Sequence, residues 1–293
     1  MRAVLFFLLG VAVCGADRPA AAEPSYAWLG GPVSGGAGGT VAERIAPPPG
    51  FRRAPAPAGS FGAWLRGLPL QPGRPPVHLY NGNLKGNQSA HWAVVRIDVG
   101  ARDLQQCADA VMRLRAEYLW AAGRREDIAF RFTSGHRAAW PDWRAGKRPR
   151  VQGSRVDWRP AAGADGSHAN FRRYLDSVFT YAGSASLEKE LVRVPDASKV
   201  EIGDVFIHGG SPGHAVIVID VAEAAGSSGQ SSGQSSGQSR RVFLLAQSYM
   251  PAQEIQILKN PAAADSPWYE AASSGPLPTP EWPFQFGELR RFR

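Results

Sequence analysis

Three side chains in this sequence have the types that a cysteine nucleophile requires. Such a nucleophile needs a position that favours the thiolate, an imidazole that takes its proton, and a polar group that orients the imidazole. Cys107 supplies the thiol, His214 the imidazole and Gln247 the orienting amide. Together they predict covalent hydrolysis of an amide bond, a reaction that requires no cofactor and no metal.

The cysteine is expected near the start of a helix. Apolar residues recur at three- and four-residue spacing through QCADAVMRLRAEYLW, and Asp103 can cap the start, so the spacing predicts a helix over residues 103–120. Cys107 would then lie in the first or second turn, where unpaired backbone N–H groups favour a thiolate. The Cys107 amide or the Gln106 side chain could stabilise the oxyanion.

The histidine and the glutamine are expected on two paired strands. The apolar runs HAVIVIDV and RVFLL flank a Gly/Ser/Gln repeat over residues 226–239, which predicts an antiparallel hairpin with a disordered tip. If Asp220 faces Arg241 at the tip, His214 faces Gln247, with Cβ atoms about 5 Å apart. A bulge would shift this register.

Longer motifs resemble an uncharacterised bacterial family, the domain of unknown function 4846. The resemblance covers residues 61–292 and is carried by QCADAVMRLRAEYLW, IGDVFI, GHAVIVID, LLAQSYMPAQEIQILKNP, SPWY and TPEW. That family supplies no established activity. The segment GDVFIHGGSPGHAVIVID is also similar to the histidine segment of the NlpC/P60 and CHAP amidases, which are papain-like cysteine hydrolases.

The similarity to these amidases implies a papain-like (NlpC/P60-like) α+β fold. In that fold an antiparallel sheet packs against an N-terminal helix that carries the cysteine. The resemblance implies the same triad, and it adds Asp204 and Gly213 as residues that line the site. The match departs after Cys107, where Ala108 and Asp109 stand in place of the usual serine or histidine and glycine.

The chain divides by composition into three parts. Residues 1–22 have the basic, apolar and small-residue regions of a cleavable signal peptide. Residues 23–60 are rich in Gly, Pro and Ala and are predicted to form a disordered linker. Residues 61–293 are predicted to form one domain. No apolar run is long enough to span a bilayer, so a periplasmic or secreted location is expected.

Charge narrows the choice of partner. The net charge is +8, but the basic residues are scattered along the chain rather than clustered, which argues against a nucleic-acid partner. An exported cysteine hydrolase would have cell-wall peptide or another envelope component as its substrate. The sequence leaves the oligomeric state open.

Each candidate residue also has a purely structural reading. Free cysteine is among the most buried residue types, so Cys107 could simply fill the core. The alternative function is therefore a non-catalytic envelope binding or scaffolding domain of the same fold. Asp204, His208 and His214 could instead hold a metal, although their spacing matches no familiar zinc motif. The tryptophans of segment 140–158 could stack on sugars or anchor the core.

Overall fold

The computed structural model describes residues 25–32, 37–225 and 240–293. The expected signal peptide at 1–22 and the repeat tip at 226–239 lie outside these residues. Among the described helices, none combines the length and the apolar character that crossing a membrane requires. The helices are α1 (Val41–Arg44), α2 (Phe61–Arg66), α3 (Cys107–Ala121), α4 (Trp140–Arg144), α5 (His168–Tyr181) and α6 (Ser184–Glu190), with 3-10 turns η1 (Ala27–Leu29), η2 (Arg125–Asp127), η3 (Ala197–Lys199) and η4 (Phe286–Glu288).

A large antiparallel sheet is the centre of the fold. Its strands are β3 (Phe51–Arg53), β4 (His91–Val94), β9 (Val192–Arg193), β10 (Val205–His208), β11 (His214–Ala224), β12 (Arg241–Gln247), β13 (Gln256–Leu258), β14 (Tyr269–Glu270) and β17 (Leu289–Arg291). The main path is β4-β13-β12-β11-β10-β17-β9, with β14 beside β12 and β3 beside β11. The α+β class expected from the sequence is therefore confirmed.

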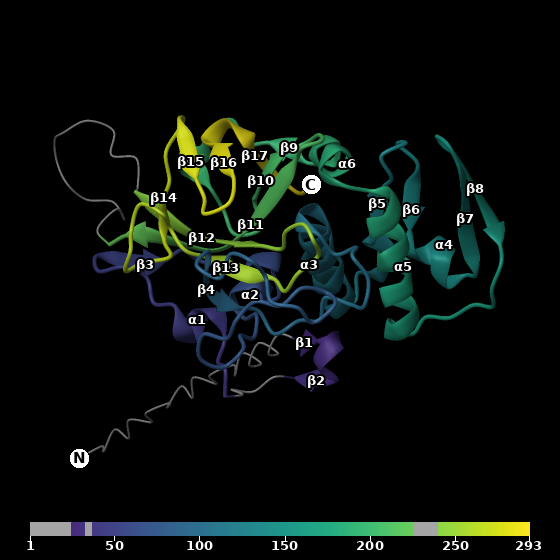
Figure 1. Cartoon of the computed structure of the whole chain (residues 1–293), viewed down its shortest axis with the longest axis horizontal. Coiled ribbons are helices and arrows are strands. Elements are labelled where there is room, and N and C mark those ends of the chain that lie inside the picture. Colours follow the sequence, from purple (N-terminus) through teal and green to yellow (C-terminus); the bar gives the residue numbers. More distant parts are fainter. Residues whose placement is uncertain (1–24, 33–36, 226–239) are drawn as a thin grey trace, which may run out of the picture.

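The remaining strands form small two-stranded pairs. They are β1 (Ser25–Tyr26) with β2 (Gly31–Pro32), β5 (Ala129–Arg131) with β6 (Arg137–Ala139), β7 (Lys147–Gln152) with β8 (Arg155–Pro160), and β15 (Pro276–Pro278) with β16 (Pro283–Gln285). Figure 1 shows α3 against one side of the central sheet and the β15–β16 hairpin on the other side. The β5–β8 strands, α4 and α5 lie together at one end of the molecule (Figure 1).

Both faces of the central sheet are covered, which explains why β11 reads as an almost continuous apolar run. Ala215 and Ile217 belong to the larger core cluster, which includes the apolar side chains of α3 and α5. Val216 and Val218 belong to a second cluster with Phe284 of β16. Side chains alternate between faces along a strand, so β11 contributes to both cores.

Helix α3 begins later than the sequence predicts. Its N-cap is Gln106, and the Oδ2 atom of Asp109 accepts a hydrogen bond from the Gln106 backbone N–H at 3.1 Å. Asp103, the expected cap, instead accepts the backbone N–H of Ala252 at 2.7 Å. The cysteine is therefore the first residue of the helix, because the expected cap is engaged in a tertiary contact.

Residues 25–32 and 37–60 do not form the disordered linker that their composition predicts. A capping box between Thr40 and Glu43 begins α1, and β3 pairs with β11. Arg53 of β3 forms an ion pair with the fully buried Asp220 at 2.9 Å. The Pro and Gly residues connect short ordered elements here, and Tyr26 of β1 is buried in the core, so the described part of the domain begins at residue 25 rather than at 61.

The first tryptophans of segment 140–158 serve packing. Trp140 is fully buried, and Trp143 is nearly so and donates its indole N–H to Asn170 of α5 at 3.0 Å. The ring of Trp140 packs edge-on against Tyr174 of α5. Of the two roles open to these residues, core anchoring is the one that the structure supports.

Candidate functional site

A cleft of about 700 Å³ lies where the starts of α3 and β11 meet. Four of the six residues expected in the site line it, namely Gln106, Cys107, Gly213 and His214. Gly213 lies close to Ser184 and to the Gly210 carbonyl, and a Cβ atom at position 213 would collide with both. The turn before β11 therefore requires glycine at this position.

His214 and Gln247 are in direct contact, as the sequence predicts. The Nε2 atom of His214 lies 2.8 Å from the Oε1 atom of Gln247, and both side chains are almost completely buried. The two residues lie on β11 and β12, which pair antiparallel. This contact is the clearest structural feature of the candidate site.

The register that led to this contact is nevertheless wrong. Arg241 faces Glu223 instead of Asp220, and the ladder is interrupted by an irregularity between Val218 and Asp220. Beyond it, the ladder ends at Ile217 opposite Ala246. Continuing that register would place Gln247 opposite Val216, so His214 and Gln247 are diagonal rather than opposed neighbours. Diagonal neighbours on one face are still within reach of long side chains.

A buried ionic network fixes the orientation of the Gln247 amide. Its Nε2 atom donates to the Glu281 carboxylate at 2.7 Å, and Lys85 donates to the same carboxylate oxygen at 2.6 Å. Since the amide nitrogen is used on Glu281, the amide oxygen must face the histidine and accept from it. His214 is then the Nε2–H tautomer, and its Nδ1 atom carries the lone pair.

Sequence reasoning missed both outer members of this network. Glu281 stands in TPEW, a motif used only to support the family resemblance. Lys85 carries no signal, because it lies in a loop and meets Glu281 across 196 positions of the chain. The Lys85 side chain is buried and that of Glu281 is largely buried, with exposed fractions of 5% and 11%, so the pair lies mostly in the interior.

Aromatic rings enclose the histidine. The ring centroids of Tyr249, Trp282 and Phe284 lie 4.8, 5.5 and 5.6 Å from that of His214. Burial among these rings lowers the pKa of His214 to about 4, although the hydrogen bond that the ring donates to Gln247 opposes the shift. The imidazole is therefore neutral at pH 7.

The thiol is less favourably placed than the sequence predicts. Cys107 is buried and belongs to the core cluster on the α3 face of the sheet, whereas His214 stacks on Phe284 on the opposite face. The two side chains meet only at the cleft, and within the described residues no hydrogen bond joins the Cys107 sulfur to the His214 ring. Burial, and then the charge of Asp109, raises the pKa of Cys107 to about 11. The expected lowering by the helix start does not prevail.

Asp109 shares the interior beside the thiol. It lines the cleft, is buried, and leaves its Oδ1 atom without a hydrogen-bond partner. Burial raises its pKa well above the usual value for an aspartate. A protonated Asp109 carries no charge and would not raise the pKa of Cys107, so the protonation states of these two groups are linked.

Asp204 does not line the cleft. Both of its carboxylate oxygens accept from the Arg291 guanidinium, at 2.6 and 2.8 Å, and the Glu201 backbone N–H also donates to it. His208 bonds to Glu288 at 2.7 Å. Asp204 and His208, two of the three residues considered as metal ligands, are thus bonded to other side chains. In the described part of the chain, no group of three His, Cys, Asp or Glu side chains could hold a metal.

The fold and the cleft define a mixed α+β protein with a buried cysteine and an oriented, neutral histidine at the end of its central sheet. The model of the family described as domain of unknown function (4846) matches residues 41–291, so the chain belongs to that family. The match confirms the resemblance seen in the sequence motifs. No curated protein and no solved structure matches the chain.

Proposed function

We propose that this protein is an exported papain-like cysteine hydrolase that cleaves an amide bond in cell-wall peptide or another envelope component. One observation carries the proposal. His214 is held by Gln247 in the tautomer that leaves Nδ1 free to accept a proton, and it lines the same cleft as Cys107. A histidine oriented by a third polar group is what a cysteine nucleophile requires.

The reaction has two covalent stages. The Cys107 sulfur attacks the substrate carbonyl carbon while its proton passes to Nδ1 of His214. The imidazolium then gives that proton to the leaving nitrogen as the C–N bond breaks, which leaves a thioester on Cys107. A water molecule gives a proton to His214 as it attacks the thioester, and the thiol is restored when the acid leaves.

The oxyanion would be stabilised at the helix start. Cys107 is the first residue of α3, so its backbone N–H has no partner within the helix. The Gln106 side chain donates one N–H to Asp103 at 3.0 Å and retains a second. These two donors are the ones expected from the sequence, and both belong to residues that line the cleft.

The resting state proposed here is a neutral thiol beside a neutral imidazole. A pKa of about 11 for Cys107 and of about 4 for His214 disfavours an ion pair between them before substrate binds. Hydrogen bonds of a catalytic site are often long before substrate binds and shorten in the complex. Proton transfer from Cys107 to His214 would therefore accompany attack instead of preceding it.

Digestion of purified peptidoglycan tests the proposal. We expect the chain to release soluble peptide fragments with new carboxyl and amino ends, identified by mass spectrometry. Cys107→Ala and His214→Ala should each abolish release, whereas Ser134→Ala, in an exposed turn outside the cleft, should leave it unchanged. Equal release by the Cys107→Ala and unchanged chains would refute the proposed chemistry.

The second candidate function is a non-catalytic envelope domain of the same fold. The observation that favours it is the burial of Cys107 together with the rise in its pKa, which is what a packed structural thiol shows. On this hypothesis Cys107→Ala lowers stability but leaves binding to envelope material intact. Sedimentation of the unchanged and the Cys107→Ala chains with intact peptidoglycan, with no soluble fragments released by either chain, would identify this second function.

Export is part of both candidate functions and rests on residues 1–22 of the sequence. Expression of the full chain in a bacterial host, followed by N-terminal sequencing of the periplasmic protein, tests it. We expect the exported protein to begin close to Glu23, after the small residues that end the expected signal peptide. Retention of the uncut chain in the cytoplasm would count against export.

A further inference from the structure

A second cavity, of about 350 Å³, lies apart from the cysteine cleft. Its walls come from the second half of α3, from η2, from the β5–β6 hairpin, from the end of α6 and from the residues after β17. Arg115 on its wall follows Cys107 by eight residues, or about 12 Å along the helix axis. The two cavities have no lining residue in common.

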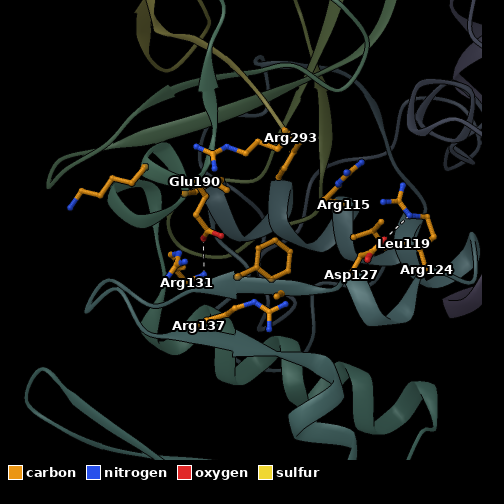
Figure 2. A pocket seen from close by; sticks show the side chains of 13 residues that line it. Arg115, Leu119, Arg124, Asp127, Arg131, Arg137, Glu190 and Arg293 are labelled. Atoms are coloured by element: carbon orange, nitrogen blue, oxygen red, sulfur yellow. Dashed lines mark hydrogen bonds and ion pairs between the residues drawn. The ribbon is translucent and has the colours of Figure 1, made fainter.

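The cavity has an excess of positive charge. Six cationic side chains line it, against two carboxylates, Asp127 and Glu190. The cations are Arg115, Arg124, Arg131, Arg137, Lys189 and Arg293. Figure 2 shows Arg131, Arg137 and Arg293 grouped around Glu190, with Arg115 and Arg124 farther along the cavity.

The two carboxylates neutralise only part of this positive charge. Asp127 pairs with Arg124 at 2.8 Å. Glu190 accepts the backbone N–H of Arg131 at 2.7 Å, and burial raises the pKa of its carboxyl. Within the described residues, no carboxylate lies within ion-pairing distance of Arg115, Arg131, Arg137, Lys189 or Arg293. The side chains that face the cavity therefore retain unpaired positive charge.

Arg115 is the most informative of these cations. Its guanidinium carbon lies 5.0 Å from the ring centroid of Phe61, 5.5 Å from that of Tyr118 and 5.1 Å from that of Phe292. The side chain is half-buried and is held by these rings. A cation removed from water without a carboxylate partner is costly, and an anion in the cavity would lower that cost.

We infer that this cavity binds the phosphate group of a phosphate monoester. A dianion with three equivalent oxygens can bond to several guanidinium groups at once, which a cavity whose arginines lie on separate elements requires. Leu119, Phe130 and Leu187 also line the cavity and offer an apolar surface to the group that carries the phosphate. The inference is independent of the proposed hydrolase activity.

Calorimetric titration of the full chain with pyrophosphate, at low ionic strength, tests the site. Pyrophosphate serves as the probe because it presents terminal phosphate groups. We expect saturable binding that Arg131→Gln/Arg137→Gln weakens at least tenfold, since both side chains are exposed and their replacement leaves the core intact. Glu190→Gln should tighten binding several-fold, because it removes a negative charge and retains the oxygen that accepts from Arg131.

Arg155→Gln provides the matched control, since Arg155 is an exposed arginine of β8 outside the cavity. This variant should bind pyrophosphate like the unchanged chain. An equal loss of pyrophosphate binding in the control and in the double variant would overturn the inference, because it would indicate general attraction to a basic protein.

Vesicles distinguish a lipid headgroup from a soluble ligand. The full chain is sedimented with phosphatidylcholine vesicles, with or without phosphatidic acid, whose headgroup is a phosphate monoester. Binding that depends on phosphatidic acid and is lost in the double variant would support the inference and assign a lipid source. Pyrophosphate binding without vesicle binding would support it and assign a soluble phosphate monoester. Failure of both probes would overturn it.

Discussion

The Oε1 atom of Gln247 lies 2.8 Å from Nε2 of His214, although the two residues are not opposed in the β11–β12 ladder. The Gln247 amide nitrogen donates to Glu281, which leaves only the oxygen to face the ring. The tautomer of His214 is thus set by a carboxylate that does not touch it. A hydrogen bond to one ring nitrogen determines which nitrogen remains free for chemistry.

The first prediction concerns that tautomer. We expect His214 to be the Nε2–H form between pH 6 and 9, as read from its side-chain nitrogen resonances by NMR. Gln247→Ala should produce a mixture of tautomers, because the acceptor on Nε2 is lost. Gln253→Ala removes a buried amide that does not contact the ring and serves as the control. A dominant Nδ1–H form in the unchanged chain would contradict the prediction.

The second prediction concerns the buried Lys85–Glu281 pair. Removing one partner of a buried pair leaves the other charge uncompensated, so Lys85→Met should lower the free energy of unfolding by about 3 kcal/mol. The double change Lys85→Met/Glu281→Gln should lower it less than Lys85→Met does, because no buried charge remains. Urea denaturation of the unchanged chain, of Lys85→Met, of Glu281→Gln and of the double variant measures this. Strictly additive effects would mean that the pair contributes nothing through its charges.

The third prediction concerns acid stability. Burial lowers the pKa of His214 from 6.5 to about 4, so between these pH values the unfolded chain binds a proton that the folded chain does not. The contribution of the neutral His214 ring to the free energy of unfolding is present in full above pH 6.5 and is lost as the pH falls towards 4. It amounts to about 3 kcal/mol for a shift of this size.

The check on this third prediction is the difference between two chains. His214→Ala should show a shallower loss of unfolding free energy from pH 7 to pH 4 than the unchanged chain, whatever its stability at pH 7. His136→Ala, which alters an exposed ring in the β5–β6 turn, should keep the original slope. If the slope is the same with and without the His214 imidazole, the ring is not buried as a neutral group.

The contact between His214 and Gln247 could be predicted in spite of a wrong register, and the reason is geometric. The tip of the hairpin is shifted by three positions, since Glu223 rather than Asp220 faces Arg241. The irregularity in β11 reduces this shift by one position, so the register near His214 differs from the predicted one by two positions. Side chains repeat on a face every two residues, so a shift of two keeps both on one face.

The rest of the site could not be predicted because it depends on long-range contacts. No local pattern connects Lys85 with Glu281, and composition alone classed residues 23–60 as a linker. The helix start was misplaced for the same reason, since Asp103 is engaged by Ala252. Local sequence patterns identified the strands and the helix, whereas burial, which sets the pKa values of Cys107 and His214, arises only from tertiary packing.

The fourth prediction tests the N-terminal boundary of the domain. A chain that starts at Phe61 lacks β3 and Arg53. The buried Asp220 then keeps one ion-pair partner, Arg66, at 2.7 Å. We expect it to be less stable than a chain that starts at Ser25 by at least about 3 kcal/mol, because an ion pair to a buried carboxylate is lost together with a strand. Equal urea midpoints would restore the linker interpretation.

The fifth prediction concerns the reactivity of Cys107, which tests whether the resting thiol is neutral. Iodoacetamide reacts with thiolate, and a pKa of about 11 leaves only about one thiol in ten thousand ionised at pH 7. We expect the alkylation rate of the folded chain to rise about tenfold per pH unit from pH 7 to pH 10. A plateau near neutrality would show that the thiolate is stabilised before substrate binds, contrary to the raised pKa.

Two variants locate the cause of the slow reaction. Asp109→Asn removes a carboxylate whose charge raises the pKa of Cys107, so its rate profile should move to lower pH. Asp142→Asn alters an exposed carboxylate on α4, away from the cleft, and should not move it. An unmoved profile in Asp109→Asn would mean that Asp109 is already neutral over this range. Burial alone would then hold Cys107 as a thiol, and the hydrolase would depend on substrate to bring sulfur and imidazole together.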